Sequence, residues 1–164
     1  MFRSGRFGTR LPFVVLFLTS CSHRIDRGET TRVRFVQSPY AAMQVLPFSE
    51  AVRVGNMLYL SGQIGNRPGT LDLVSGGIEA ESRQCMENIR AILERNNSSL
   101  GRVIKCSVFL ADIAEWPRFN EVYKTYFPAS PPARSALAAS GLALGARVEV
   151  ECIAVVAAGA GHEE

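Results

Sequence analysis

The strongest constraint on the fold is a β-hairpin signal in the first half of the chain. Two short runs rich in apolar and β-branched residues, 51–54 and 57–60, are separated only by Gly55-Asn56. Gly and Asn tolerate the positive φ angles of a two-residue hairpin turn, so the pattern predicts two adjacent antiparallel strands. The other elements of the chain must then cover at least one face of this sheet.

The remaining patterns alternate between strands and helices. We expect residues 61–65 to close the second hairpin strand, a loop at 66–77, and further strands at 32–35, 103–110, 133–140 and 147–156. Helical spacing of apolar residues predicts one helix at 78–95, ended by Asn96-Asn97, and a second at 116–126 with Pro117 in its first turn. This order predicts an α+β two-layer sandwich, a mixed sheet with both helices on one face. If its other face is apolar, self-association is one way to bury it.

The N-terminal residues have a different character from the rest. Three arginines (Arg3, Arg6, Arg10) precede the apolar run 11–18, and Thr19-Ser20-Cys21 follows. This is the pattern of a signal peptide at 1–21, and the run is too short to span a bilayer. Residues 18–21 resemble a bacterial lipobox, so we expect lipidation at Cys21; a plain cleavage site, or an upstream start on a cytosolic protein, are the alternatives.

The expected organisation is therefore a leader, a polar tether at 22–31, one domain at 32–158 and a tail at 159–164. The expected location is outside the cytosol, in a bacterial periplasm, with the lipid on Cys21 as the only contact with a membrane. Residues 1–20 hold three of the 18 Lys and Arg and no acid, which leaves 15 basic and 15 acidic residues. A neutral body gives no support for a nucleic-acid partner.

The inventory of reactive side chains excludes several reaction classes. The histidines are His23 in the tether and His162 in the tail, so a Ser/His or Cys/His pair has no base in the domain. The four cysteines lack metal-ligand spacing, so we do not expect zinc, and no glycine-rich phosphate loop occurs, so NTPases and dinucleotide oxidoreductases are unsupported. Cys106 and Cys152 could pair in an oxidising compartment, although a buried cysteine is more often a small hydrophobe.

Two charged residues interrupt otherwise apolar strands and require an explanation. Arg134 lies in Pro132-Ala133-Arg134-Ser135, and Glu149 lies in Val148-Glu149-Val150-Glu151. A guanidinium is a planar fork that fits a carboxylate, either of a side chain or of a small substrate. From the residues alone, a structural ion pair and a carboxylate-binding site both remain open.

These two segments resemble the C-terminal signature of the RidA (YjgF-type) family. Asn56-Met57 with Ser61-Gly62-Gln63-Ile64 resembles the hairpin of that family, and Asn120 with Tyr123 resembles its second helix. Residues 74–77 and 110–113 fit as well. The resemblance runs from about Pro47 to Val156, in the order and approximate spacing of the family.

The resemblance implies a chorismate-mutase-like protomer that assembles as a homotrimer, with a site at each subunit interface and no cofactor. The implied reaction is hydrolysis of 2-aminoacrylate, 2-iminobutanoate and related 2-imino acids to 2-oxo acids and ammonia. Arg134 is expected to bind the substrate carboxylate, and Glu149 to position water and move protons. Ser61, Gly62, Asn120, Phe48 and Ala136 complete the expected site.

Three departures from the family pattern bear on activity. The usual tyrosine after the proline is Phe48, which lacks the hydroxyl, and the usual cysteine two residues after the arginine is Ala136, whose backbone carbonyl is retained. The loop before Arg134 is shorter. The alternative function is therefore a catalytically weak trimeric module that binds small carboxylates in the same cleft; RNA cleavage is a third and weaker hypothesis, because the body is neutral and has no histidine base.

Overall fold

The computed structural model describes residues 32–157 as one α+β unit. The expected leader at 1–21 with Cys21, the tether at 22–31 and the tail at 159–164 lie outside the described residues.

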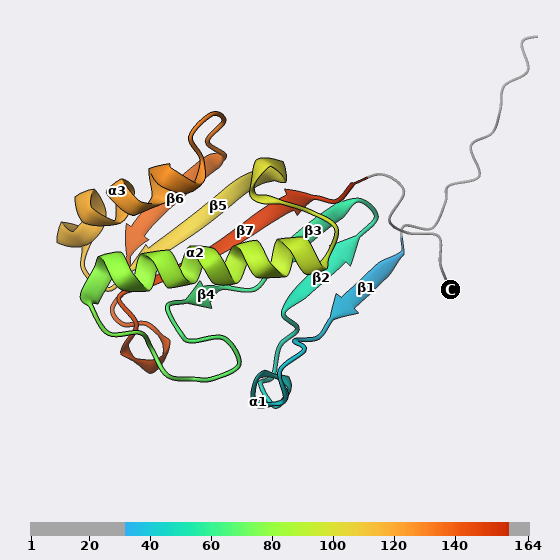
Figure 1. Ribbon diagram of the computed structural model, residues 1–164, viewed down its shortest axis with the longest axis horizontal. Coiled ribbons are helices and arrows are strands. Elements are labelled where there is room, and N and C mark those ends of the chain that lie inside the picture. Colours follow the sequence, from blue (N-terminus) through green and yellow to red (C-terminus); the bar gives the residue numbers. More distant parts are fainter. Residues whose placement is uncertain (1–31, 158–164) are drawn as a thin grey trace, which may run out of the picture. The chain divides into compact units, whose positions relative to one another are not determined.

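The centre of the fold is a seven-stranded mixed sheet (Figure 1). Its strands are β1 (Val33–Val36), β2 (Ala51–Val54), β3 (Met57–Leu60), β4 (Gln63–Ile64), β5 (Val103–Leu110), β6 (Ala133–Ala138) and β7 (Val148–Val155). The order is β1-β2-β3-β7-β5-β6, and β4 also pairs with β7. Of these pairings, β5 with β6 is parallel and the others are antiparallel.

Two long helices, α2 (Gly77–Arg95) and α3 (Trp116–Tyr126), cover one face of the sheet (Figure 1). The other helical elements are α1 (Ala41–Gln44) and the 3-10 turns η1 (Leu100–Arg102), η2 (Ile113–Glu115) and η3 (Ala143–Gly145). The predicted two-layer α+β fold is confirmed. In the part of the chain that the structure describes, no helix is both long and apolar enough to cross a membrane.

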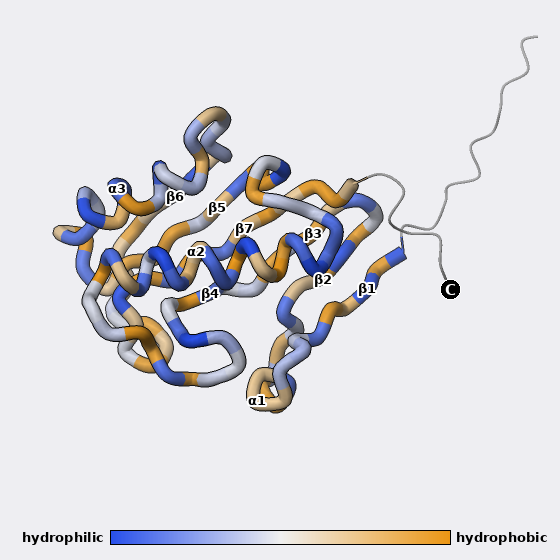
Figure 2. Tube along the Cα trace, viewed as in Figure 1, coloured by the Kyte–Doolittle hydropathy of each residue, from blue (hydrophilic) through white to orange (hydrophobic). Residues whose placement is uncertain are grey.

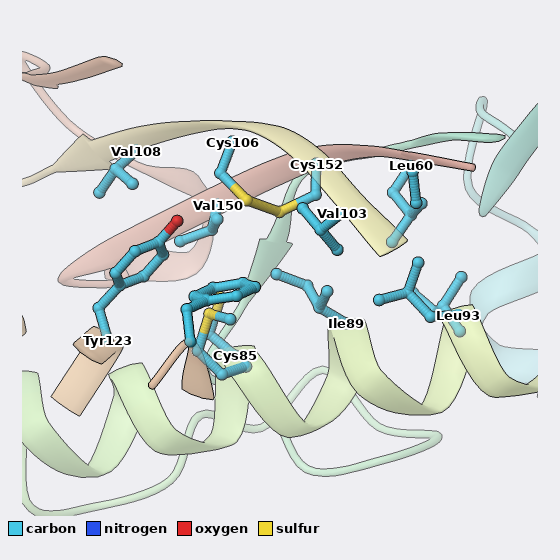
Figure 3. Close-up of a cluster of buried hydrophobic side chains, with 14 of the residues drawn as sticks. Leu60, Cys85, Ile89, Leu93, Val103, Cys106, Val108, Tyr123, Val150 and Cys152 are labelled. Atoms are coloured by element: carbon cyan, nitrogen blue, oxygen red, sulfur yellow. A yellow bond between two sulfur atoms is a disulfide. The ribbon is translucent and has the colours of Figure 1, made fainter. Parts of the chain in front are cut away.

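The core lies between the sheet and α2, because apolar residues recur on α2 at helical spacing. Ile78, Cys85, Ile89 and Leu93 are fully buried against the sheet, whereas the opposite side of α2 is polar (Figure 2). Figure 3 shows Cys85, Ile89 and Leu93 pointing toward the strands. The helix ends as predicted at Asn96, and Asn97 has a φ of 57°, which Asn tolerates better than most residues.

The segment after the hairpin departs from the prediction. Residues 61–65 do not continue β3, because Tyr59 pairs with Ile153 while Gln63 pairs with Val150. Four residues on one strand thus oppose three on the other, which is a β-bulge, and Gln63–Ile64 form the separate strand β4. The helix α1 was not predicted either, since a single turn is too short to show a periodic pattern.

The face of the sheet away from α2 and α3 is partly apolar and exposed. The strand β5 is buried on one face only, and Ile104 is 46% exposed. Phe35, Tyr59 and Leu137 are 67%, 43% and 49% exposed, and the strand register places all three on this face. The sheet therefore has an exposed apolar face that self-association would bury.

A disulfide joins Cys106 on β5 to Cys152 on β7 (Figure 3). The two residues are direct cross-strand partners with their Cα atoms 4.2 Å apart, and both are at most 1% exposed. The bond lies in the hydrophobic core, and the two cysteines that it joins are separated by 46 residues in the sequence.

We expect reduction of this disulfide to lower the free energy of unfolding by about 2–4 kcal/mol, because a cross-link restricts the unfolded chain. Urea unfolding of the wild-type protein with and without a thiol reductant measures this difference. The double variant Cys106→Ala/Cys152→Ala is the control, since its midpoint should not respond to reductant. Equal midpoints for oxidised and reduced wild-type protein would contradict the expectation.

Candidate active site

Arg134 on β6 lies over two aromatic rings of α3. Its Cζ atom is 4.7 Å from the ring centroid of Tyr123 and 5.9 Å from that of Phe119, which is cation–π geometry. No ion pair or hydrogen bond of the Arg134 side chain occurs within residues 32–157. The structural ion pair that remained open from sequence is therefore absent from the described protomer, and the guanidinium is held in place with its donors unused.

The surroundings of Arg134 contain polar atoms without partners. The Tyr123 hydroxyl and the Asn120 Oδ1 atom are buried and have no hydrogen-bond partner among residues 32–157. Burial raises the pKa of Tyr123 to about 12, and the nearby charge of Arg134 opposes that rise. Ala136 lies two residues beyond Arg134 on the same face of β6 and packs against the core. We call Arg134, Ala136, Phe119, Asn120 and Tyr123 the Arg134 cluster.

Glu149 on β7 is surrounded by residues from the hairpin. Gly62, in the bulge, leaves room for its side chain, because a Cβ atom at position 62 would overlap the Glu149 carboxylate. The neighbouring Ser61 hydroxyl donates a hydrogen bond of 2.7 Å to the Ser49 carbonyl, which ties the bulge to the residue after Phe48. We call Phe48, Ser61, Gly62 and Glu149 the Glu149 cluster.

The Glu149 carboxylate is set up to take a proton more readily than an ordinary glutamate. Burial raises its pKa, and the negative charge of Glu151 adds to the rise. No ion pair or hydrogen bond of this carboxylate occurs in the described part of the chain. A half-buried carboxylate with a raised pKa and free oxygens is suited to accept and return protons.

The two clusters do not meet within one protomer. Arg134 pairs with Cys106, which pairs with Cys152, so its side chain leaves the sheet on the face that the helices cover. Glu149 lies three residues from Cys152 and therefore leaves on the opposite face. The register separates the two Cα atoms by two strands and three residues, roughly 14 Å. Every expected site residue falls in one of two half-sites, but a single copy cannot bring both to one small molecule.

A groove with a volume of about 580 Å³ adjoins the Glu149 cluster. Its walls come from residues 38–50, from residues 62–71 around β4, from α2 and from η3, and Phe48, Gly62 and Glu149 line it. The lining is mainly apolar. Residues 32–157 contain no group of three or more His, Cys, Asp or Glu that could hold a metal ion.

Comparison with known proteins assigns the family. The family model described as Endoribonuclease L-PSP matches residues 38–156. The chain belongs to this family. The human 2-iminobutanoate/2-iminopropanoate deaminase is 38% identical over 122 residues, which are 74% of this chain and 89% of that protein. Protein DfrA of Myxococcus xanthus is 39% identical, over 73% of this chain and 93% of that protein.

Solved structures of this family share the fold. RidA from the Antarctic bacterium Psychrobacter matches with a TM-score of 0.69 and 37% identity, covering 75% of this chain and 99% of that one. The YjgF gene product of E. coli matches with a TM-score of 0.68 and 30% identity, covering 74% and 98%. The resemblance to the RidA family is thereby confirmed, and so is the two-layer fold that it implied.

Sequence reasoning missed the role of two residues in this site. Phe119 and Tyr123 are core residues of the apolar side of α3, and their rings also support the guanidinium of Arg134. Helical spacing showed that they share a face, while the strand opposite that face could not be known from spacing alone.

Proposed function

We propose that this protein hydrolyses small 2-imino acids and their enamine tautomers, such as 2-iminobutanoate and 2-aminoacrylate, to 2-oxo acids and ammonia. The observation that carries the proposal is a pair of complementary groups: Arg134, which has no anionic partner among residues 32–157, and the half-buried Glu149 carboxylate with its raised pKa. The names of the related deaminases point to the same chemistry.

In the proposed reaction, the Arg134 guanidinium donates two hydrogen bonds to the substrate carboxylate. Glu149 accepts a proton from a water molecule, whose oxygen forms a bond with the imine carbon while the electron pair of the C=N bond moves to nitrogen. Glu149 then returns that proton to the nitrogen. When the carbinolamine collapses, Glu149 takes the hydroxyl proton and passes it to the amino nitrogen, the C=O bond forms as the C–N bond breaks, and the products are ammonia and a 2-oxo acid. An imine carbon is already electrophilic, so positioning and proton transfer suffice.

The proposal requires a homotrimer in which the Arg134 cluster of one subunit faces the Glu149 cluster of the next. Each copy offers both half-sites on different faces, and a head-to-tail contact between unlike surfaces closes into a ring. The exposed apolar side chains Phe35, Tyr59 and Leu137 supply a surface for such contacts. The carboxylate beside each arginine would then come from a neighbouring subunit or from the substrate.

We also propose that the protein is exported, and two independent features support this. The first is the leader-like pattern that ends at Cys21. The second is the Cys106–Cys152 disulfide, since structural disulfides persist mainly in oxidising compartments. The mass of the mature N-terminal peptide distinguishes a lipidated Cys21 from plain cleavage.

The second candidate function is binding of small carboxylates without efficient turnover. It is favoured by Phe48, which lines the groove beside Glu149 and has no hydroxyl with which to orient a substrate. The family description also names an endoribonuclease, but the domain has no histidine base and is neutral overall.

Ammonia release from 2-aminoacrylate and 2-iminobutanoate, generated in situ, tests the proposal. We expect purified residues 22–164 to accelerate it above the spontaneous rate, and sedimentation of the same sample to give a trimer. A well-folded trimer that accelerates neither reaction would support the binding module instead, and the variant Phe48→Tyr would then show whether the hydroxyl restores turnover.

A further inference from the structure

The groove beside Glu149 is much larger than the proposed small substrates require. A volume of about 580 Å³ lies within the range of roughly 300–1,000 Å³ that is typical of sites for whole small molecules. A three-carbon or four-carbon imine placed at Glu149 would leave most of this space unused. The groove is continuous with the Glu149 cluster, because Phe48, Gly62 and Glu149 form part of its wall.

The lining of the groove favours apolar groups. Met43 and Leu46 contribute from the segment before β2, and Ile64 and Leu71 from the segment around β4. Ala91 and Ile92 line it from α2, where the small side chain of Ala91 leaves the groove open. Contact with these side chains would stabilise an aliphatic or aromatic group by removing its surface from water.

The charges on the wall disfavour an acidic group. Among the described lining residues three are carboxylates, Glu50, Glu87 and Glu149, and one is a cation, Arg95. Arg95 donates a hydrogen bond of 2.9 Å to Glu50, so its positive charge is already balanced by that carboxylate. The other Glu50 oxygen, Oε2, is buried and has no partner among residues 32–157. Glu87 is likewise paired with Arg90, at 2.8 Å. A carboxylate that entered this groove would therefore meet the negative charge of Glu149 and no lining cation with an uncompensated charge.

We infer that the groove receives the side chain of the substrate, and that the enzyme selects 2-imino acids with extended apolar side chains over small and acidic ones. The inference rests on the proposed imine hydrolysis and adds its substrate class. In this arrangement the reacting carbon lies at Glu149 and the substrate carboxylate lies at Arg134 of the neighbouring subunit. The substrate side chain then extends into the groove.

The test compares imines generated in situ by an amino-acid oxidase from alanine, leucine and glutamate, and measures kcat/KM from ammonia release. For the wild-type protein we expect the leucine-derived imine to be hydrolysed at least about tenfold more efficiently than the glutamate-derived imine. In Ala91→Trp, which fills the groove from α2, the leucine-to-alanine ratio should fall about tenfold. Met43→Trp fills the groove from the opposite wall and should have the same effect if Ala91→Trp fails to fold.

The matched control is Glu94→Trp, an exposed position on the same helix that does not line the groove, and it should keep the wild-type ratio. Unchanged ratios in well-folded Ala91→Trp and Met43→Trp would overturn the inference while imine hydrolysis itself stands. Equal efficiency for the leucine-derived and glutamate-derived imines would overturn it as well. If the wild-type protein hydrolyses none of the three imines, both the proposed function and this inference are wrong.

Discussion

Replacement of Arg134 by alanine should lower kcat/KM for 2-iminobutanoate by about two to three orders of magnitude and leave the fold intact. Loss of a charge-assisted, two-point contact with a carboxylate costs about 2–5 kcal/mol in a desolvated site. Among residues 32–157, in contrast, the interactions of the Arg134 side chain are its cation–π contacts with the Tyr123 and Phe119 rings. Such cation–π contacts contribute about 0.5–2 kcal/mol to stability, so the thermal midpoint should fall only modestly.

The variant Arg134→Lys separates charge from geometry. Lysine keeps the positive charge but lacks the planar fork, so it should restore only a small part of the lost kcat/KM. Collapse of the fold in Arg134→Ala, or loss of the trimer, would instead assign Arg134 a structural role. Ammonia release, circular dichroism and sedimentation on the same preparations distinguish these results.

Replacement of Glu149 by glutamine should lower kcat/KM by about a hundredfold and remove the acidic limb of the pH profile. Burial and the charge of Glu151 raise the pKa of Glu149. As the pH falls, the ionised form that accepts the proton is therefore lost at a higher pH than for an ordinary glutamate. Wild-type kcat/KM should therefore rise with pH through that pKa and level off above it. The profile of Glu149→Gln should be flat over the same range.

Glu151→Gln is the matched control, because Glu151 lies two residues away on the same face of β7 but is exposed. It should retain turnover and move the acidic limb to lower pH, since removal of the neighbouring negative charge lowers the pKa of Glu149. An acidic limb that persists unchanged in Glu149→Gln would rule out Glu149 as the proton acceptor.

Most of the fold could be predicted from local patterns. The hairpin at 51–60, the strand at 103–110 and the helix at 116–126 have the predicted bounds, and α2 begins one residue earlier than predicted. Gly55-Asn56 marks the turn between the hairpin strands, Asn96-Asn97 marks the end of α2, and Pro117 marks the first turn of α3. The bulge before β4 was missed because it depends on the register with β7, and no local signal reports that register.

For the candidate site, the sequence proposes the residues but does not show how they are arranged. Alternation along the last strand is enough to place Glu149 on the face opposite Val148 and Val150, and the burial pattern of β7 agrees. The face of Arg134 follows from the parallel pairing of β6 with β5, which links residues far apart in sequence. The same long-range register brings Cys106 opposite Cys152 and allows the disulfide that the sequence left open.

Subunit mixing tests most directly whether the active site is built from two subunits. Arg134→Ala and Glu149→Gln subunits, each inactive alone, are co-expressed with different tags, and trimers that carry both tags are purified. In every mixed ring one interface combines an intact Arg134 with an intact Glu149, so we expect about one third of wild-type activity. Mixed trimers as inactive as their parents would contradict an interface site and place the chemistry, if any, within a single subunit.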